Sequence, residues 1–206
     1  MRLSPRLLVL AVVAFALADW GETLAGSSFF PGGPLDETAH LLTMLLVLWA
    51  LGARVLDRFG AAALAASVAI DLDHVPQYLG DDVLTRGTPR PYSHSLLTII
   101  VVLIVAVVWR HRRDIFLGIA LGLAFHFWRD LSEPGSGVAL LWPFTDHSFS
   151  FSPTGYLLIM GAIVAFDAWK CWARRPSARP IPLPDGVALS GLSRRLRAHL
   201  RADPES

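Results

Sequence analysis

Apolar segments alternate with short polar ones along most of the chain, in a pattern that predicts membrane helices. Six segments stand out, and they cover residues 7–18, 40–56, 59–70, 96–109, 115–128 and 156–169. Each is shorter than the roughly 20 residues that a membrane helix prefers, so we expect tilted helices or polar ends that reach into the bilayer. The Ala-rich third segment suits either a closely packed helix or a re-entrant one. The pattern predicts an all-α integral membrane bundle of five to six transmembrane helices.

The composition agrees with a membrane protein. Of the 206 residues, 53% are hydrophobic and 17% are charged, which is too apolar for an ordinary soluble domain. The single cysteine, Cys171, excludes an internal disulfide and a thiolate zinc cluster. Tryptophans near the segment ends, Trp142 among them, are typical of an aromatic belt rather than of base stacking. We therefore expect the lipid bilayer as a partner and no nucleic acid.

Lys and Arg residues are distributed unevenly between the two sides of the predicted bundle. If the N-terminus is cytoplasmic, fifteen of the 18 fall on the inner side, while Arg86, Arg90 and Arg129 fall outside. Because cytoplasmic segments carry the excess of positive charge, this count predicts that orientation. Five of the seven histidines then face outward.

The two ends of the chain differ from its apolar middle. The first segment resembles a secretory signal with small residues before Asp19, and cleavage there would leave five helices; we favour its retention. We divide the chain into a transmembrane domain, residues 1–173, and a Pro- and Arg-rich cytoplasmic tail, residues 174–206. Leucines at helical spacing from Leu189 to Leu200 predict either a short amphipathic helix on the membrane or a solvated tail.

Histidine and aspartate residues gather at the predicted outer ends of the apolar segments. Three pairs have a spacing that places both side chains on one helix face: Asp36 with His40, Asp71 with His74, and His126 with Asp130. Taken alone, each spacing is as typical of a structural hydrogen bond as of a metal site. Ionisable groups at a bilayer are costly and usually functional, so clusters that share one face predict a single site.

His94 lies just before the fourth apolar segment. We predict that Ser93 is the N-cap of the following helix, where the helix N-terminus favours a neutral imidazole that can bind a metal. Imidazoles and carboxylates without cysteine suit a divalent metal ion, zinc first and manganese second. Such an ion can activate water and polarise a scissile carbonyl or phosphoryl group, which allows hydrolysis. A serine nucleophile is disfavoured, because no Gly-x-Ser-x-Gly motif surrounds Ser93.

The order of these motifs resembles that of a known family. In sequence they are His40-Leu-Leu, Asp71-Leu-Asp-His74, Arg90-Pro-Tyr-Ser-His94-Ser, His126-x-x-x-Asp130 and Leu140-Leu-Trp-Pro143. In this order they resemble the membrane-bound metal-dependent hydrolases of bacteria, the YdjM-like inner-membrane proteins, over about residues 36–155. The resemblance implies a multi-pass protein of the bacterial inner (plasma) membrane. Its pattern is also distantly similar to zinc-dependent phospholipases C and fungal single-strand nucleases, which implies phosphoester chemistry by analogy.

The resemblance carries over to individual residues. The predicted metal ligands are His40, Asp73, His74, His94, His126 and Asp130, and the predicted catalytic carboxylates are Asp71 and Asp130. Arg90 and Arg129, beside candidate ligands, are predicted either to bind a substrate phosphate or to neutralise the acidic cluster. The family usually has a histidine where this chain has Pro89; if that histidine binds metal in relatives, this site has one ligand fewer.

We therefore predict a metal-dependent hydrolase that acts on an ester or phosphoester at the extracytoplasmic membrane face. The substrate is a small molecule or is carried by a lipid, since short segments would keep the site near the headgroups. An alternative is a non-enzymatic membrane protein that binds or transports divalent cations, and intramembrane carboxylates motivate it. A catalytically inactive scaffold is a third interpretation.

Overall fold

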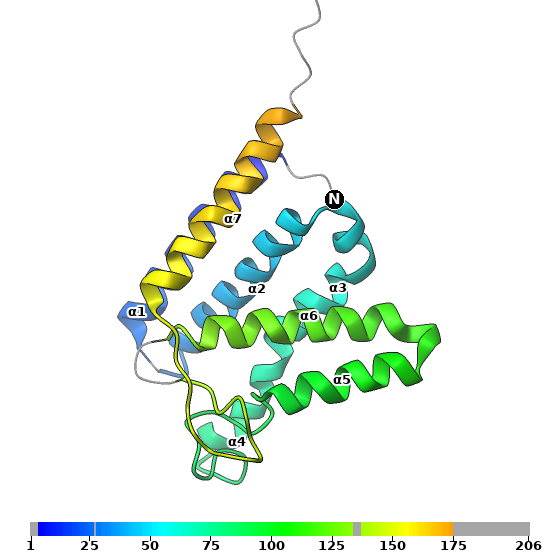
Figure 1. Ribbon diagram of the computed structural model, residues 1–206. Coiled ribbons are helices and arrows are strands. Elements are labelled where there is room, and N and C mark those ends of the chain that lie inside the picture. Colours follow the sequence, from blue (N-terminus) through cyan, green and yellow to red (C-terminus); the bar gives the residue numbers. More distant parts are fainter. Residues whose placement is uncertain (1–3, 27, 134–136, 175–206) are drawn as a thin grey trace, which may run out of the picture. The chain divides into compact units, whose positions relative to one another are not determined.

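Helices make up nearly all the regular structure of the chain in the computed structural model, which describes residues 4–26, 28–133 and 137–174. Six long helices are present in this part of the chain: α1 (Pro5–Ala25), α2 (Gly32–Leu51), α3 (Ala53–Ala69), α5 (Leu96–Val108), α6 (Arg113–Asp130) and α7 (Pro153–Ala173) (Figure 1). Two 3-10 turns, η1 (Ile70–His74) and η2 (Arg110–Arg112), and the short helix α4 (Val75–Tyr78) lie in the connections. The all-α prediction is confirmed, and each predicted apolar segment lies mainly in one long helix, although the second, residues 40–56, runs past the end of α2 at Leu51 into the start of α3.

Three of these helices, α1, α2 and α7, are long and apolar enough to cross a membrane. Helix α5 is apolar but has only 13 residues. Helices α3 and α6 begin with charged residues, and α6 also ends on Arg129 and Asp130, so their apolar stretches are shorter than the helices themselves. Among the described residues, length and composition thus support three spans, fewer than the five to six that we predicted.

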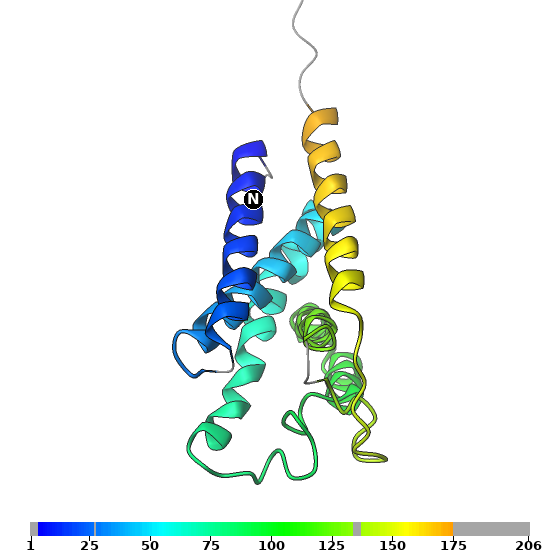
Figure 2. The same ribbon diagram turned by 90° about the vertical axis from the view of Figure 1, so that its left-hand side faces the viewer.

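Helix α2 is the central element of the bundle. It contacts α1, α3, α6 and α7, and Figure 2 shows it crossing between α1 and α7. Phe15 of α1 packs in one hydrophobic cluster with Leu46 and Trp49 of α2 and with Tyr156 and Met160 of α7. Helix α1 is therefore joined to the rest of the bundle by a shared core. It also continues unbroken past Asp19, where the sequence resembles a cleavage site.

Two glycines allow α6 to approach α3 closely. A Cβ atom at Gly118 would lie 2.7 Å from the carbonyl oxygen of Phe59 and 2.8 Å from the Cβ of Ala62. A Cβ atom at Gly122 would lie 3.0 Å from the Cβ of Ala66. These three distances are shorter than ordinary van der Waals contacts, so the two helices approach each other closely at the glycines. This contact fixes the register of α6 against α3.

The connection between α6 and α7 returns to the start of α5. The backbone N–H of Leu96 donates a hydrogen bond to the carbonyl of Leu140, at 2.9 Å. Trp142 stacks on Tyr92 with 4.6 Å between ring centroids, and its place in an aromatic belt stays a prediction. These contacts hold the segment that carries His94 in place.

The described residues up to Ala173 form one compact unit, and the division from the following segment falls at Arg174. Of that segment, only Arg174 belongs to the described residues. The amphipathic helix predicted between Leu189 and Leu200 lies outside them and stays a prediction.

Candidate metal centre

The predicted site residues meet at one end of the bundle, although they come from distant parts of the chain. His40 lies in α2, Asp71, Asp73 and His74 lie in η1, His94 precedes α5, and His126 and Asp130 lie at the end of α6. Groups of these side chains place their ligand-type atoms within 4.8 Å of one another. Four of the side chains, those of His40, His94, His126 and Asp130, are fully buried. The structure therefore contains buried His/Asp groups that could hold a metal ion.

One atom from each of four side chains, Asp71, His94, His126 and Asp130, takes part in a set of short contacts, and we call these four atoms the quartet. The Nε2 atom of His94 lies 3.1 Å from Oδ1 of Asp71 and 3.2 Å from Nε2 of His126. The Nε2 atom of His126 lies 3.3 Å from Oδ1 of Asp71 and 3.2 Å from Oδ2 of Asp130. The same oxygen of Asp130 lies 3.5 Å from Nε2 of His94. In a tetrahedral zinc site with bonds of about 2.0–2.1 Å, neighbouring ligand atoms are about 3.3 Å apart. The quartet thus consists of two triangles that share His94 and His126, one completed by Asp71 and the other by Asp130, and each triangle has the spacing of neighbouring ligands around one such ion.

The close packing of α6 on α3 orients His126. Gly118, Gly122 and His126 follow one another at four-residue spacing, so they share one face of α6. The Nδ1 atom of His126 lies 2.9 Å from the carbonyl oxygen of Ser67 in α3. An N–H at Nδ1 can donate to this carbonyl and leave the lone pair of Nε2 facing the quartet, as in many metal sites.

His94 is oriented in a similar way by η1. Its Nε2 atom faces the quartet, while its Nδ1 atom lies 3.4 Å from Oδ2 of Asp73. The hydroxyl of Ser93 donates a hydrogen bond to the same carboxylate. Ser93 is thus not the helix cap that we predicted: α5 begins at Leu96 with Ser95 in the cap position, because the Ser93 side chain is turned toward η1.

Several buried polar atoms of the site have no hydrogen-bond partner in the described part of the chain. They include both carboxylate oxygens of Asp130, Nε2 of His40 and Nε2 of His74. A buried polar atom left without a partner costs about 1–3 kcal/mol. A cation in the quartet would lie near carboxylate oxygens and imidazole nitrogens that have no hydrogen-bond partner among the described residues. The residues therefore fit a divalent metal.

Arginine side chains neutralise the acidic groups on the far side of His40. There, Asp36 and Glu133 lie with His40 in another group of metal-ligand type. Arg90 donates a hydrogen bond to Glu133 and lies 3.5 Å from Oδ1 of Asp130. This leaves Oδ2 of Asp130 to the quartet. Since guanidinium groups already balance the charge on this side, the quartet is the better cation site.

Arg129 connects the site to α1. It donates a hydrogen bond to Asp19 at 2.8 Å and another to Glu22, and it lies 3.5 Å from Asp36. Its side chain is only 3% exposed. These contacts favour the prediction that Arg129 neutralises acidic groups over the one in which it binds substrate.

Three acidic residues of the site were missed from sequence. Asp19 and Glu22 belong to α1, and Glu133 follows α6 and pairs with Arg90. The signal was present, because Glu133 lies three residues after Asp130, and Asp19 and Glu22 lie one turn apart at the end of an apolar segment. In contrast, Asp146 and His147 lie in an exposed loop and belong to none of the metal-binding groups found among the described residues.

The surroundings adjust the acidity of groups in the connecting segments. Burial and the neighbouring His94 lower the pKa of His74, which favours its neutral imidazole. Burial opposes ionisation of Asp71, but hydrogen bonds with His126 and His94 outweigh it and lower the pKa of Asp71 below its ordinary value. Burial raises the pKa of Glu133 to about 7 despite the charge of Arg90. A neutral imidazole and an ionised carboxylate are the forms that bind metal.

Apolar side chains are exposed next to the site. Leu72, between two site aspartates, is 71% exposed, and Leu79, just after α4, is 81% exposed. The exposed rings of Phe29 and Tyr78 meet edge to face, with 5.1 Å between their centroids. This end of the bundle therefore combines a charged centre with an apolar rim.

The comparison with known proteins gives one match. Residues 35–184 match the family model described as YdjM inner membrane protein. The matched region contains the whole quartet and runs from α2 into the tail. No curated protein and no solved structure matches the chain.

Proposed function

Because the chain belongs to the YdjM inner membrane protein family, which is described as membrane-bound metal-dependent hydrolases, we propose that it hydrolyses an ester or phosphoester with the help of a divalent metal. The observation that carries the proposal is the spacing of the quartet, Asp71, His94, His126 and Asp130. Zinc fits a site of imidazoles and carboxylates best, and manganese is the alternative. His40, Asp73 and His74 surround the quartet as the remaining proposed metal-site residues.

The site residues have different roles in the proposed hydrolysis. When bound, the metal supplies a water of lowered pKa and polarises the oxygen of the scissile group. Asp71 offers Oδ1 to the quartet, while its Oδ2 has no hydrogen bond among the described residues and is free to accept a proton from water. Asp130 is fully buried, so it acts as a ligand that also fixes His126. Arg90 balances the charge of Asp130, and it is the arginine nearest the quartet for contact with a phosphoryl group.

We propose that the substrate is carried by a lipid. The exposed apolar rim of Leu72, Leu79, Phe29 and Tyr78 supports this proposal, because such side chains favour the headgroup region of a bilayer over water. A substrate held in the membrane would reach the site laterally. A small soluble ester would have no need of the rim.

The charge count supports an orientation with the site outside and the tail in the cytoplasm. Under this proposal α3, α5 and α6 also extend across much of the bilayer beside the three longer helices, which gives six crossings, or five if the first segment is cleaved. Their short apolar stretches require tilt or local thinning of the bilayer.

A cation-binding or transport protein is the second candidate. The observation in its favour is burial: the side chains of His40, His94, His126 and Asp130 are all 0% exposed. A closed site holds an ion well but admits water and substrate poorly. Metal flux in proteoliposomes without hydrolysis would favour this function.

The deciding experiment measures metal content and hydrolysis on the purified full-length protein. We expect stoichiometric metal and turnover of at least one reporter among carboxyl esters, phosphomonoesters and phosphodiesters. His126→Ala should lose both, because it removes a central quartet atom. His147→Ala, which changes a histidine in an exposed loop, is the matched control and should retain both. Wild-type protein that stays metal-free after incubation with zinc and manganese would contradict the proposal.

A further inference from the structure

The turn between α5 and α6 concentrates positive charge at a distance from the metal centre. A hollow of about 340 Å³ is lined there by Arg58, Arg110, Arg112 and Arg113, together with His111 and Asp114. The turn lies at the first residue of α6, whereas Asp130 is the last. At 1.5 Å per residue, the helix separates the two places by roughly 25 Å. The hollow is therefore a separate feature of the molecule.

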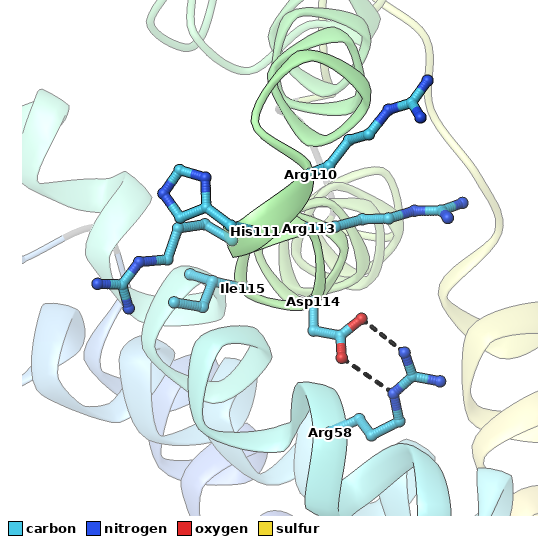
Figure 3. Close-up of a pocket in the computed structure, with 7 residues that line it drawn as sticks. Arg58, Arg110, His111, Arg113, Asp114 and Ile115 are labelled. Carbon is cyan, nitrogen blue, oxygen red and sulfur yellow. Dashed lines mark hydrogen bonds and ion pairs between the residues drawn. The ribbon is translucent and has the colours of Figure 1, made fainter.

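Most of this charge has no partner within the described chain. Arg58 donates two hydrogen bonds to Asp114, at 3.0 and 2.8 Å. In the described part of the structure, no carboxylate lies within ion-pair distance of the other three arginines. Figure 3 shows Arg110 and Arg113 extending to the same side of the turn, while His111 points to the opposite side. Two guanidinium groups on one side can contact one phosphate.

An apolar hollow precedes the charged one along the chain. It has a volume of about 400 Å³ and is lined by Ile104, Val105 and Val108 of α5 and by Trp109, which follows the helix. Val108 is 77% exposed and Trp109 is 54% exposed. Trp109 is followed directly by Arg110, so the apolar lining ends where the basic residues begin.

We propose that this turn binds an anionic phospholipid. The phosphate lies against Arg110 and Arg113, and an acyl chain follows the apolar hollow beside Trp109. The charge of the three arginines without a carboxylate partner selects a lipid of net negative charge over a zwitterionic one. The adjoining apolar lining selects a lipid over a soluble phosphate. The proposed lipid site is independent of the metal centre and of hydrolysis.

The test compares lipid retention by the full-length protein in native mass spectrometry. We expect phosphatidylglycerol to be retained in preference to phosphatidylcholine with the same acyl chains. Arg110→Gln and Arg113→Gln should each weaken retention of phosphatidylglycerol about fivefold, as expected for one basic residue near an anionic lipid. Val108→Ser should also weaken it by reducing contact with the acyl chain. These side chains are exposed, so the variants should fold, and gel filtration verifies this.

The controls separate this site from general attraction to lipid. Arg86→Gln removes an exposed arginine that pairs with Asp82 in a connecting loop, and it should leave retention unchanged. Equal retention of both lipids, or an equal loss in Arg86→Gln, would overturn the proposal. Displacement of phosphatidylglycerol by glycerol 3-phosphate would do so as well, since it would indicate a site for soluble phosphate.

Discussion

At the scale of single residues, Asp71 and Asp73 have different surroundings although one residue separates them. Oδ1 of Asp71 lies 3.1 Å from His94 and 3.3 Å from His126, at the nitrogen atoms that face the quartet. Asp73 faces the other nitrogen of His94 and accepts a hydrogen bond from Ser93. Asp71 is thus placed to contact a metal directly, and Asp73 to orient a ligand.

This difference predicts unequal effects of the same substitution. Asp71→Asn should abolish stoichiometric metal binding, because it removes a charge from the quartet. Asp73→Asn should weaken metal affinity only about 10–100-fold, as is typical when the partner of a ligand is changed. Competition with a zinc-chelating dye measures both, and Asp81→Asn in an exposed loop serves as the control. Equal losses at the two positions would refute the assignment.

The sequence predicted which side chains meet but not how they share the site. Spacing placed His126 and Asp130 on one helix face, and the structure brings them within 3.2 Å. The family resemblance made Asp73 a metal ligand, which stays a prediction, and the local sequence made Ser93 a helix cap; in the structure the Ser93 hydroxyl donates a hydrogen bond to Asp73. That contact joins η1 to the segment before α5, and no local spacing encodes such a tertiary pairing.

At the scale of elements, the contact between α3 and α6 is the one that the site depends on most. The glycine face of α6 that lies against α3 continues into His126 and, one turn later, into Asp130. Any displacement of α6 from α3 would therefore move two quartet atoms together. The geometry of the metal centre therefore depends on the packing of α6 against α3.

Gly122→Ala tests this dependence. The added methyl would lie 3.0 Å from the Cβ of Ala66 and meet the backbone of Ala63, so we expect a loss of about 1–3 kcal/mol of stability and weaker metal binding. Gly161→Ala in α7 is the matched control. Its Cβ would meet nothing within 4 Å, so stability should be unchanged or slightly higher. Thermal unfolding in detergent compares them, and equal melting temperatures would contradict the close contact.

The helices themselves were predictable because long apolar runs leave few other choices in a membrane protein. Their role in the membrane was harder to predict. Helix α3 extends over the charged residues Arg54, Asp57 and Arg58, and α6 ends in Arg129 and Asp130. An apolar run shows where a helix is, but its charged ends decide whether the helix is suited to cross a bilayer.

At the scale of the whole molecule, the proposed orientation makes opposite predictions for two exposed positions. In a Cys171→Ser background, Asp81→Cys should react with a membrane-impermeant thiol reagent added outside intact cells. His111→Cys should react only after the membrane is opened. Both side chains are exposed, whereas Ser132 on the predicted outer side is buried and unsuitable for labelling. The reverse pattern of labelling would invert the proposed topology.

The quartet has a consequence for how the molecule assembles. Its atoms come from η1, from the segment before α5 and from α6, with His40 of α2 beside them. The chain has a single cysteine and cannot form an internal disulfide. An ion in the quartet would act like such a cross-link. It would join elements whose covalent connection otherwise runs only through loops. An ion present at 100 times its dissociation constant would add about 2.7 kcal/mol to the stability of the bundle. The supply of metal during membrane insertion would then help to determine how much of the protein reaches its folded state.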